Sequence, residues 1–272
     1  MEKMKPFEEL TFHDDFMFGL VMQDRELCRE ALECLLGIRI SRIEHSEPQK
    51  TIAPLYTAHG IRLDVYVEDG ETVYDVEIQN RDERDMGRRT RYYQGMMDVD
   101  SLLKGQVYSE LKHSVIIFLC RFDPFKKGIP CYTIERTCWE DRSVELEDGA
   151  EVHIFNCTAY RNAENESMRA FLKFVQTDRA ESELTRRLGS MVEAQKGIEA
   201  NKKVYLSWSL HDHDVRKHGR EEGIQENRLE NARNMLADNM PLEKISQYTG
   251  LAIKEVQSLA ESLADTMSAK SR

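Results

Sequence analysis

The segment IRLDVYVEDGETVYDVEIQN, residues 61–80, decides the fold of this chain. Apolar and polar residues alternate on both sides of Asp69-Gly70, which is the pattern of β-strands that differ in polarity from one face to the other. An Asp-Gly pair between two alternating runs favours a hairpin with a two-residue turn. The sequence therefore predicts an antiparallel hairpin in which Asp64 pairs with Asp75.

Acidic side chains gather on one face of this predicted hairpin. Cross-strand partners share a face, and so do residues two apart along a strand. The residues on that face are Asp64, Asp75, Glu77 and Gln79. Like charges at this spacing repel one another unless a cation, a proton or solvent compensates them, and Mg²⁺ prefers carboxylate oxygens. The alternative is that each acid is an ordinary solvent-facing strand residue.

Asp64 and Glu77-Ile78-Gln79 resemble the catalytic signature of the PD-(D/E)XK nuclease superfamily. That signature has an aspartate on one strand and, on the next, an acid, any residue and a lysine. Leu63 stands where the name-giving proline would be, and Gln79 replaces the lysine. The E-x-Q form is similar to the recombination-promoting nuclease and transposase branch. Further segments that carry the resemblance are residues 11–16, 88–93, 115–118 and 122–125, so it covers most of residues 10–160.

The resemblance implies a bacterial, mobile-element-linked DNA endonuclease that hydrolyses phosphodiester bonds with Mg²⁺ or Mn²⁺. It assigns the metal to Asp64 and Glu77. It assigns the positioning of the attacking water to Gln79, whose amide forms hydrogen bonds but is no base. An acid on the first helix can join the metal in the resembling family, so Asp15 is the expected third carboxylate. The alternative is a catalytically inactive, transposase-derived protein that binds nucleic acid or oligomerises.

A run of arginines follows the second strand of the hairpin. Arg88, Arg91 and Tyr92 are predicted on or beside one face of a helix over residues 86–104, where they would bind DNA phosphate. The alternative is a charged helix start with a tyrosine half in the core. The apolar stripe expected on this helix is Tyr92, Met96, Val99 and Leu103.

The remaining pattern predicts an α/β fold, with a mixed sheet flanked by helices as in restriction endonucleases. Apolar spacing predicts a helix over residues 11–36 that ends at Gly37. Asp14 is expected to cap it, because Thr11 stands three residues earlier. The other predicted strands are residues 38–44, 113–121, 130–135, 144–146 and 152–155. A nuclease-like core is thus expected over residues 8–160.

Strand patterns stop near residue 163, and charged helical sequence follows. We predict a helical extension over residues 163–218, then a charged helix and a helix-turn-helix-like hairpin over residues 219–272, with its turn at Thr249-Gly250. The second helix of this hairpin has no cluster of base-reading side chains, so a simple packing role is the alternative. This tail is expected to serve DNA engagement or homo-oligomer formation.

Composition narrows the class of protein further. The chain has 272 residues and a formal net charge of −11, which argues against a protein that coats DNA with its whole surface. The six cysteines form no CxxC pair and are expected to be buried thiols of a cytoplasmic protein. No apolar run is long enough to span a bilayer, so no membrane partner is expected.

Overall fold

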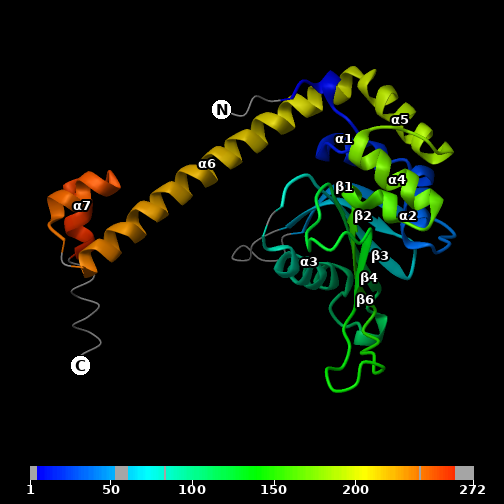
Figure 1. Ribbon diagram of the computed structural model, residues 1–272, viewed down its shortest axis with the longest axis horizontal. Coiled ribbons are helices and arrows are strands. Elements are labelled where there is room, and N and C mark those ends of the chain that lie inside the picture. Colours follow the sequence, from blue (N-terminus) through cyan, green and yellow to red (C-terminus); the bar gives the residue numbers. More distant parts are fainter. Residues whose placement is uncertain (1–4, 53–60, 83, 239, 261–272) are drawn as a thin grey trace. The chain divides into compact units, whose positions relative to one another are not determined.

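The computed structural model describes residues 5–52, 61–82, 84–238 and 240–260. The predicted α/β fold is confirmed: a six-stranded mixed sheet is flanked by helices, and helices alone follow it (Figure 1). The chain divides into two compact units, Met1–Lys203 and Val204–Arg272. The first unit contains the whole sheet.

The sheet has the strand order β1-β2-β3-β4-β6-β5. The strands are β1 (His45–Ile52), β2 (Ile61–Glu68), β3 (Thr72–Gln79), β4 (His113–Cys120), β5 (Cys131–Ile134) and β6 (Ala150–Asn156). Pairing is antiparallel from β1 to β3, parallel from β3 through β4 to β6, and antiparallel between β6 and β5. Helices cover both faces of the central strands, which is why β4 is buried and apolar over nearly its whole length.

One face of the sheet is covered by α3 (Met86–Ser101), which packs on β4 and β1 (Figure 1). The helix is also tied to the sheet by a polar contact, since the buried side-chain amide of Gln94 donates to the carbonyl oxygen of Ser114 at 3.1 Å. The apolar cluster on this face includes Met86, Met96, Met97, Ile116 and Phe118.

The helices of the opposite face are α1 (Asp15–Met22), α2 (Arg25–Leu36), α4 (Glu166–Thr177) and α5 (Glu183–Lys196). The helix α1 packs directly on β1 and β2. Gly19 permits this approach, because a Cβ there would lie 3.3 Å from the Cβ of Pro48. Phe12 makes edge-on ring contacts with Phe18 and Phe171, which join α1 to α4. The predicted extension therefore begins with helices that belong to the first unit.

The N-terminal prediction needs two corrections. The prediction of a single helix over residues 11–36 is wrong, because the helical segment is interrupted before Asp24. The carboxylate of Asp24 accepts the N–H groups of Glu26 and Leu27 and so caps the start of a second helix, α2. The helix does end at Gly37, which has φ 69°. The strand over residues 38–44 is also wrong: these residues form an extended loop whose buried Ile40 and Ile43 are three apart, and β1 follows it.

Two further boundaries differ from the prediction. Residues 144–146 form no strand and contribute only the isolated bridge between Thr137 and Glu145. Val144 and Leu146 are exposed, so no buried face stabilises a strand there. The helix predicted to residue 104 ends at Ser101, and Leu102 is already extended.

The second unit has a small helical core. It contains most of α6 (Glu199–Ala237), then α7 (Leu242–Thr249) and helical residues 253–260. Its buried residues are Ala232, Ile245, Leu251 and Val256. Gly250, at φ 71°, ends α7 and makes the predicted turn. Residues 261–272 of the predicted hairpin lie outside the described residues. Among the described helices, none is both long and apolar enough to cross a membrane.

Candidate active site

The β2–β3 hairpin turns at Gly70-Glu71, one residue later than predicted. The N–H of Asp69 donates to the carbonyl oxygen of Thr72 at 3.2 Å, so these two residues close the loop. The carboxylate of Asp69 also accepts the N–H of Thr72 and the hydroxyl of Tyr74. These bonds hold Asp69 at the strand end and keep it out of the turn.

This turn changes the register but not the faces. Tyr66, and not Asp64, pairs with Asp75, so the predicted pairing is wrong by two residues. A slip of two residues returns every side chain to its own face. Along β3, Asp75, Glu77 and Gln79 share one face, and Asp64 comes directly before the last recorded pair of this ladder, Val65 with Val76.

Asp64 and Glu77 bond to each other's strands through their side chains. The N–H of Asp64 donates to Oε1 of Glu77 at 2.9 Å, and the N–H of Ile78 donates to Oδ2 of Asp64 at 3.1 Å. The last backbone pair recorded in this ladder is Val65 with Val76. Beyond it, the two carboxylates join the strands, and this fixes the position of both acids.

The acids are more deeply buried than ordinary solvent-facing strand residues. Asp75 is fully buried, Glu77 is 2% exposed, and Asp64 is half-buried. Burial is the main cause that raises the pKa of each carboxyl well above its usual value. The neighbouring acids raise these pKa values further, Glu77 acting on Asp64, Asp64 on Asp75 and Asp75 on Glu77. Neither carboxylate oxygen of Asp75 has a hydrogen-bond partner in the described part of the chain.

Asp15 stands at the start of α1, beside the end of β3. The side-chain amide of Asn80, the residue after β3, donates to Oδ1 of Asp15 at 3.4 Å and to the carbonyl oxygen of His13 at 2.9 Å. The charge of Asp15 adds to the rise in the pKa of both Asp64 and Glu77. The structure thus brings the third predicted carboxylate within electrostatic range of the other two.

Asp14 takes the N-cap position of α1 but makes no side-chain bond to the helix. Its Oδ2 instead accepts the N–H of Thr11 at 2.6 Å and the ammonium group of Lys5. Asp14 therefore closes the turn before α1 and is not directed into the acidic face.

Arg89 lies within the site, although among the arginines only its neighbours Arg88 and Arg91 were predicted as site residues. Its guanidinium donates to Oε1 of Gln79 at 3.1 Å and lies 3.4 Å from Oε2 of Glu77. It also donates to the hydroxyl of Tyr93 at 3.3 Å. The carbon of the guanidinium lies 5.6 Å from the centre of the Phe118 ring. Arg89 thus contacts two of the predicted catalytic residues at once.

The predicted arginines lie elsewhere on α3. Arg88, Arg91 and Tyr92 are exposed, and Arg88 lies 3.6 Å from Asp85 in an ion pair. The predicted apolar stripe is wrong at three positions, because Tyr92, Val99 and Leu103 are exposed. The buried positions of α3 are Met86, Thr90, Gln94, Met96 and Met97. Tyr93 follows Arg89 by four residues, so the two side chains lie on the same side of α3. The spacing of the buried positions, together with this pair, could have predicted that Arg89 faces the sheet.

No group of three or more His, Cys, Asp or Glu side chains among the described residues is arranged to hold a metal ion. Mg²⁺ takes only one or two protein carboxylates and keeps several waters. Asp64 and Glu77 together offer such a pair.

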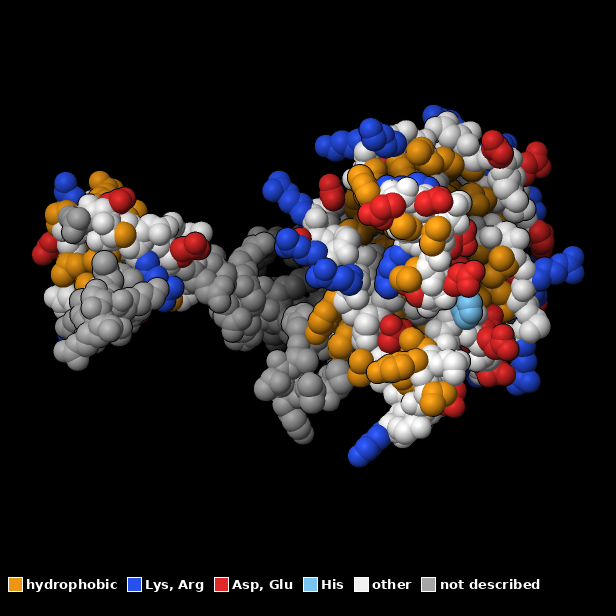
Figure 2. Space-filling view, turned by 90° about the horizontal axis from the view of Figure 1, so that it is seen from below, with side chains coloured by type: hydrophobic (Ala, Val, Ile, Leu, Met, Phe, Trp, Pro, Cys, Tyr) orange, Lys and Arg blue, Asp and Glu red, His pale blue; other side chains and the backbone are white. Residues whose placement is uncertain are grey.

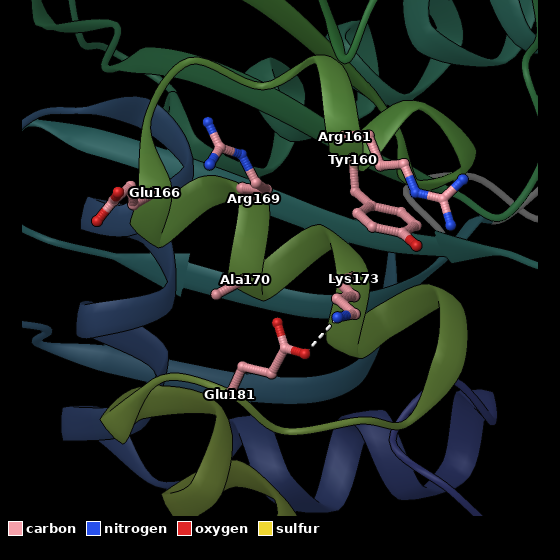
Figure 3. Close-up of a pocket in the computed structure, with 7 residues that line it drawn as sticks. All are labelled: Tyr160, Arg161, Glu166, Arg169, Ala170, Lys173 and Glu181. Atoms are coloured by element: carbon pink, nitrogen blue, oxygen red, sulfur yellow. Dashed lines mark hydrogen bonds and ion pairs between the residues drawn. The ribbon is translucent and has the colours of Figure 1, made fainter.

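A separate pocket of about 380 Å³ lies beside α4 (Figure 3). Three of its polar side chains are engaged within the protein: Lys173 pairs with Glu181, and the guanidinium of Arg169 donates to the carbonyl oxygen of Ala163. The pocket shares no residue with the acidic face of the hairpin. It does not extend the candidate site.

The protein surface carries both signs of charge. Figure 2 shows Lys and Arg side chains mixed with Asp, Glu and hydrophobic side chains on the drawn face of the larger unit. The drawn face is therefore not uniformly basic, in keeping with the net charge of −11.

The chain matches a known protein family by sequence. The sequence model of a family described as PD-(D/E)XK nuclease family transposase matches residues 12–205. The matched range contains Asp15, both strands of the hairpin and Arg89. No curated protein and no solved structure matches the chain.

Proposed function

The chain belongs to the PD-(D/E)XK nuclease family transposases, and from this premise we propose that it is a metal-dependent DNA endonuclease that hydrolyses phosphodiester bonds. The observation that carries the proposal is the pair Asp64 and Glu77, each fixed by a hydrogen bond to the other's strand. The bacterial, mobile-element-linked and cytoplasmic setting implied by the resemblance is part of this proposal.

The residues present fit a divalent cation. Three neighbouring acids raise one another's pKa, and the buried oxygens of Asp75 have no hydrogen-bond partner among the described residues. Such a cluster attracts a positive ion. Asp64 and Glu77 would hold Mg²⁺ or Mn²⁺, with Asp15 as the third carboxylate. When bound, the ion lowers the pKa of a coordinated water and polarises the phosphate.

Gln79 would position the attacking water. Its Oε1 already accepts a hydrogen bond from Arg89, which leaves the amide nitrogen to donate to a water oxygen. Because an amide cannot take a proton, Gln79 orients the water and does not act as a general base.

Arg88, Arg91 and Tyr92 would bind the DNA backbone. All three are exposed at the start of α3, the helix that carries Arg89 to the acidic face. Exposed guanidinium groups bind phosphate oxygens without the cost of breaking a buried contact.

A cleavage assay tests the proposed function. We expect the purified full chain to cut plasmid DNA in Mg²⁺ or Mn²⁺, and EDTA to abolish cutting. Asp64→Asn should lower the cleavage rate by at least about a hundredfold, because it removes a charge from the metal ligands. A protein that binds DNA without cutting it in either metal would favour the alternative, an inactive transposase-derived binding protein.

A further inference from the structure

Arg89 contacts the atoms that the proposed chemistry needs. Its guanidinium reaches Oε2 of Glu77, a proposed metal ligand, and Oε1 of Gln79, which would position the water. Oε1 of Glu77 is taken by the N–H of Asp64. Both oxygens of the Glu77 carboxylate are therefore engaged by donors of the protein itself.

The helix α3 holds the guanidinium in place while leaving it partly accessible. The Arg89 side chain is 23% exposed, whereas that of Glu77 is 3% exposed. The guanidinium lies 5.4 Å from the centre of the Tyr93 ring and donates to the Tyr93 hydroxyl. Tyr93 and Phe118 could keep the guanidinium at the edge of the site after it leaves Glu77, because cations bind favourably over aromatic rings.

The contact with Glu77 is long for a buried ion pair. The nitrogen–oxygen distance is 3.4 Å, and charge-assisted bonds of this kind are usually shorter, about 2.7–2.9 Å. The guanidinium therefore compensates the acidic cluster only in part, and a second cation would compete for the same carboxylate.

We propose that Arg89 is a positioning residue that holds Glu77 in the metal-free protein and competes with the divalent cation for it. Loading the site requires Arg89 to release Glu77 while it keeps its contacts with Gln79 and Tyr93. Arg89 thus restores, from α3, the positive charge that the E-x-Q motif lacks on β3. The inference rests on the proposed function, since it needs a cation at Asp64 and Glu77.

Mn²⁺ binding without DNA tests this competition. The dissociation constant is measured by titration calorimetry on the full chain, and the melting temperature is measured in EDTA. Arg89→Gln should bind Mn²⁺ about tenfold more tightly, because a repelling charge has gone. The same variant should melt at a lower temperature in EDTA, because Glu77 has lost its partner. A purely structural role for Arg89 would lower the melting temperature without tightening Mn²⁺ binding.

Three variants serve as controls. Arg89→Lys keeps the charge, so its dissociation constant should stay within about threefold of the unchanged protein. Arg186→Gln removes the same charge from an exposed arginine of α5 that pairs with Glu183, and it should change neither measurement. Asp64→Asn should abolish the Mn²⁺ site.

The outcomes separate the two proposals. If Asp64-dependent Mn²⁺ binding is present but Arg89→Gln binds equally or more weakly, the competition is overturned and the proposed function stands. If Arg89→Gln does not fold, Arg89→Lys decides, since a dissociation constant more than about threefold from that of the unchanged protein overturns the competition. If the unchanged protein shows no Asp64-dependent Mn²⁺ binding, both proposals are overturned.

Discussion

The two faces of β3 are equally buried but carry side chains of different chemistry. On the face toward α1, Val76 and Ile78 fill an apolar core. On the face toward α3, Asp75 and Glu77 occupy the corresponding positions and are just as inaccessible to solvent. A single strand thus places hydrocarbon on one side and acid on the other at the same depth.

The difference shows where the protein gives up stability. Burial of apolar area contributes roughly 25 cal/mol per Å² to folding, whereas burial of a carboxylate is costly unless it is paired and hydrogen-bonded. Glu77 receives one backbone N–H and the Arg89 guanidinium, while Asp75 receives no hydrogen bond from the described residues. The α3 face therefore stores electrostatic repulsion that a cation or protons would relieve.

The largest expected effect is a loss of DNA cleavage with little change in stability. Glu77→Gln removes the charge from the α3 face but keeps the shape of the side chain. We expect DNA cleavage to fall by at least about a hundredfold and the free energy of unfolding to stay within about 1 kcal/mol of the unchanged value. Cleavage rates and urea unfolding measure the two quantities. A variant that cuts DNA normally would remove Glu77 from the site.

A substitution on the opposite face should have the converse effect, lowering stability while leaving activity unchanged. Ile117 of β4 is fully buried there, so Ile117→Ala should lower the free energy of unfolding by about 2–5 kcal/mol through the cavity that it leaves. The cleavage rate per folded molecule should change little, because no acid is touched. Urea unfolding gives the first quantity and active-fraction assays the second. A variant that stays stable but loses cleavage would contradict the separation of the two faces.

The pH dependence of stability should differ between the unchanged protein and Asp75→Asn. The folded state raises the pKa of Asp75, so the folded protein binds more protons than the unfolded chain once the pH exceeds the ordinary carboxyl value. The stability contribution is therefore present at low pH and is lost as the pH rises, by at most about 1.4 kcal/mol per pH unit for one carboxyl.

Asp75→Asn should flatten this fall, because its amide does not titrate. Melting temperatures in EDTA between about pH 5 and about pH 8 measure the slope. Equal slopes in the two proteins would show that Asp75 does not carry the effect.

The smallest expected effect concerns the tail. A chain shortened to residues 1–218 keeps both faces of the sheet and all the helices that cover them. We expect its cleavage rate at saturating DNA to stay within about twofold, since the proposed catalytic and metal-binding residues all lie within residues 15–79. DNA affinity or oligomeric state should change, and gel shifts and light scattering would detect this. If neither changes, the tail has no role in DNA engagement or assembly.

The shared face of Asp75, Glu77 and Gln79 could be predicted because side chains alternate along β3. The register could not, because the side chain of Asp69 bonds to Thr72 and Tyr74 and so moves the turn by one residue. The shift of two residues gave Asp75 the partner Tyr66 in place of Asp64 and left Asp75 on its predicted face. Alternation is thus a more secure guide to a site than turn composition.

Arg89 escaped prediction because α3 was given the wrong buried stripe. Tyr92 and Val99 look like core residues by type, yet both are exposed, and the inward side includes the polar Thr90 and Gln94. Gln94 is buried because it has a partner on β4, a contact that spacing along one helix does not reveal. The break at Asp24 was missed for a similar reason, since the apolar spacing continues across it.

The side-chain bonds between β2 and β3 make the hairpin a reporter of its own site. The amide hydrogens of Asp64 and Ile78 are held by carboxylates. Any event that moves those carboxylates away also removes the hydrogen-bond acceptors of these two amides. Their exchange with deuterated water would then quicken while the neighbouring amides of Val65 and Val76 stay protected, so occupancy could be followed without substrate, turnover or a label.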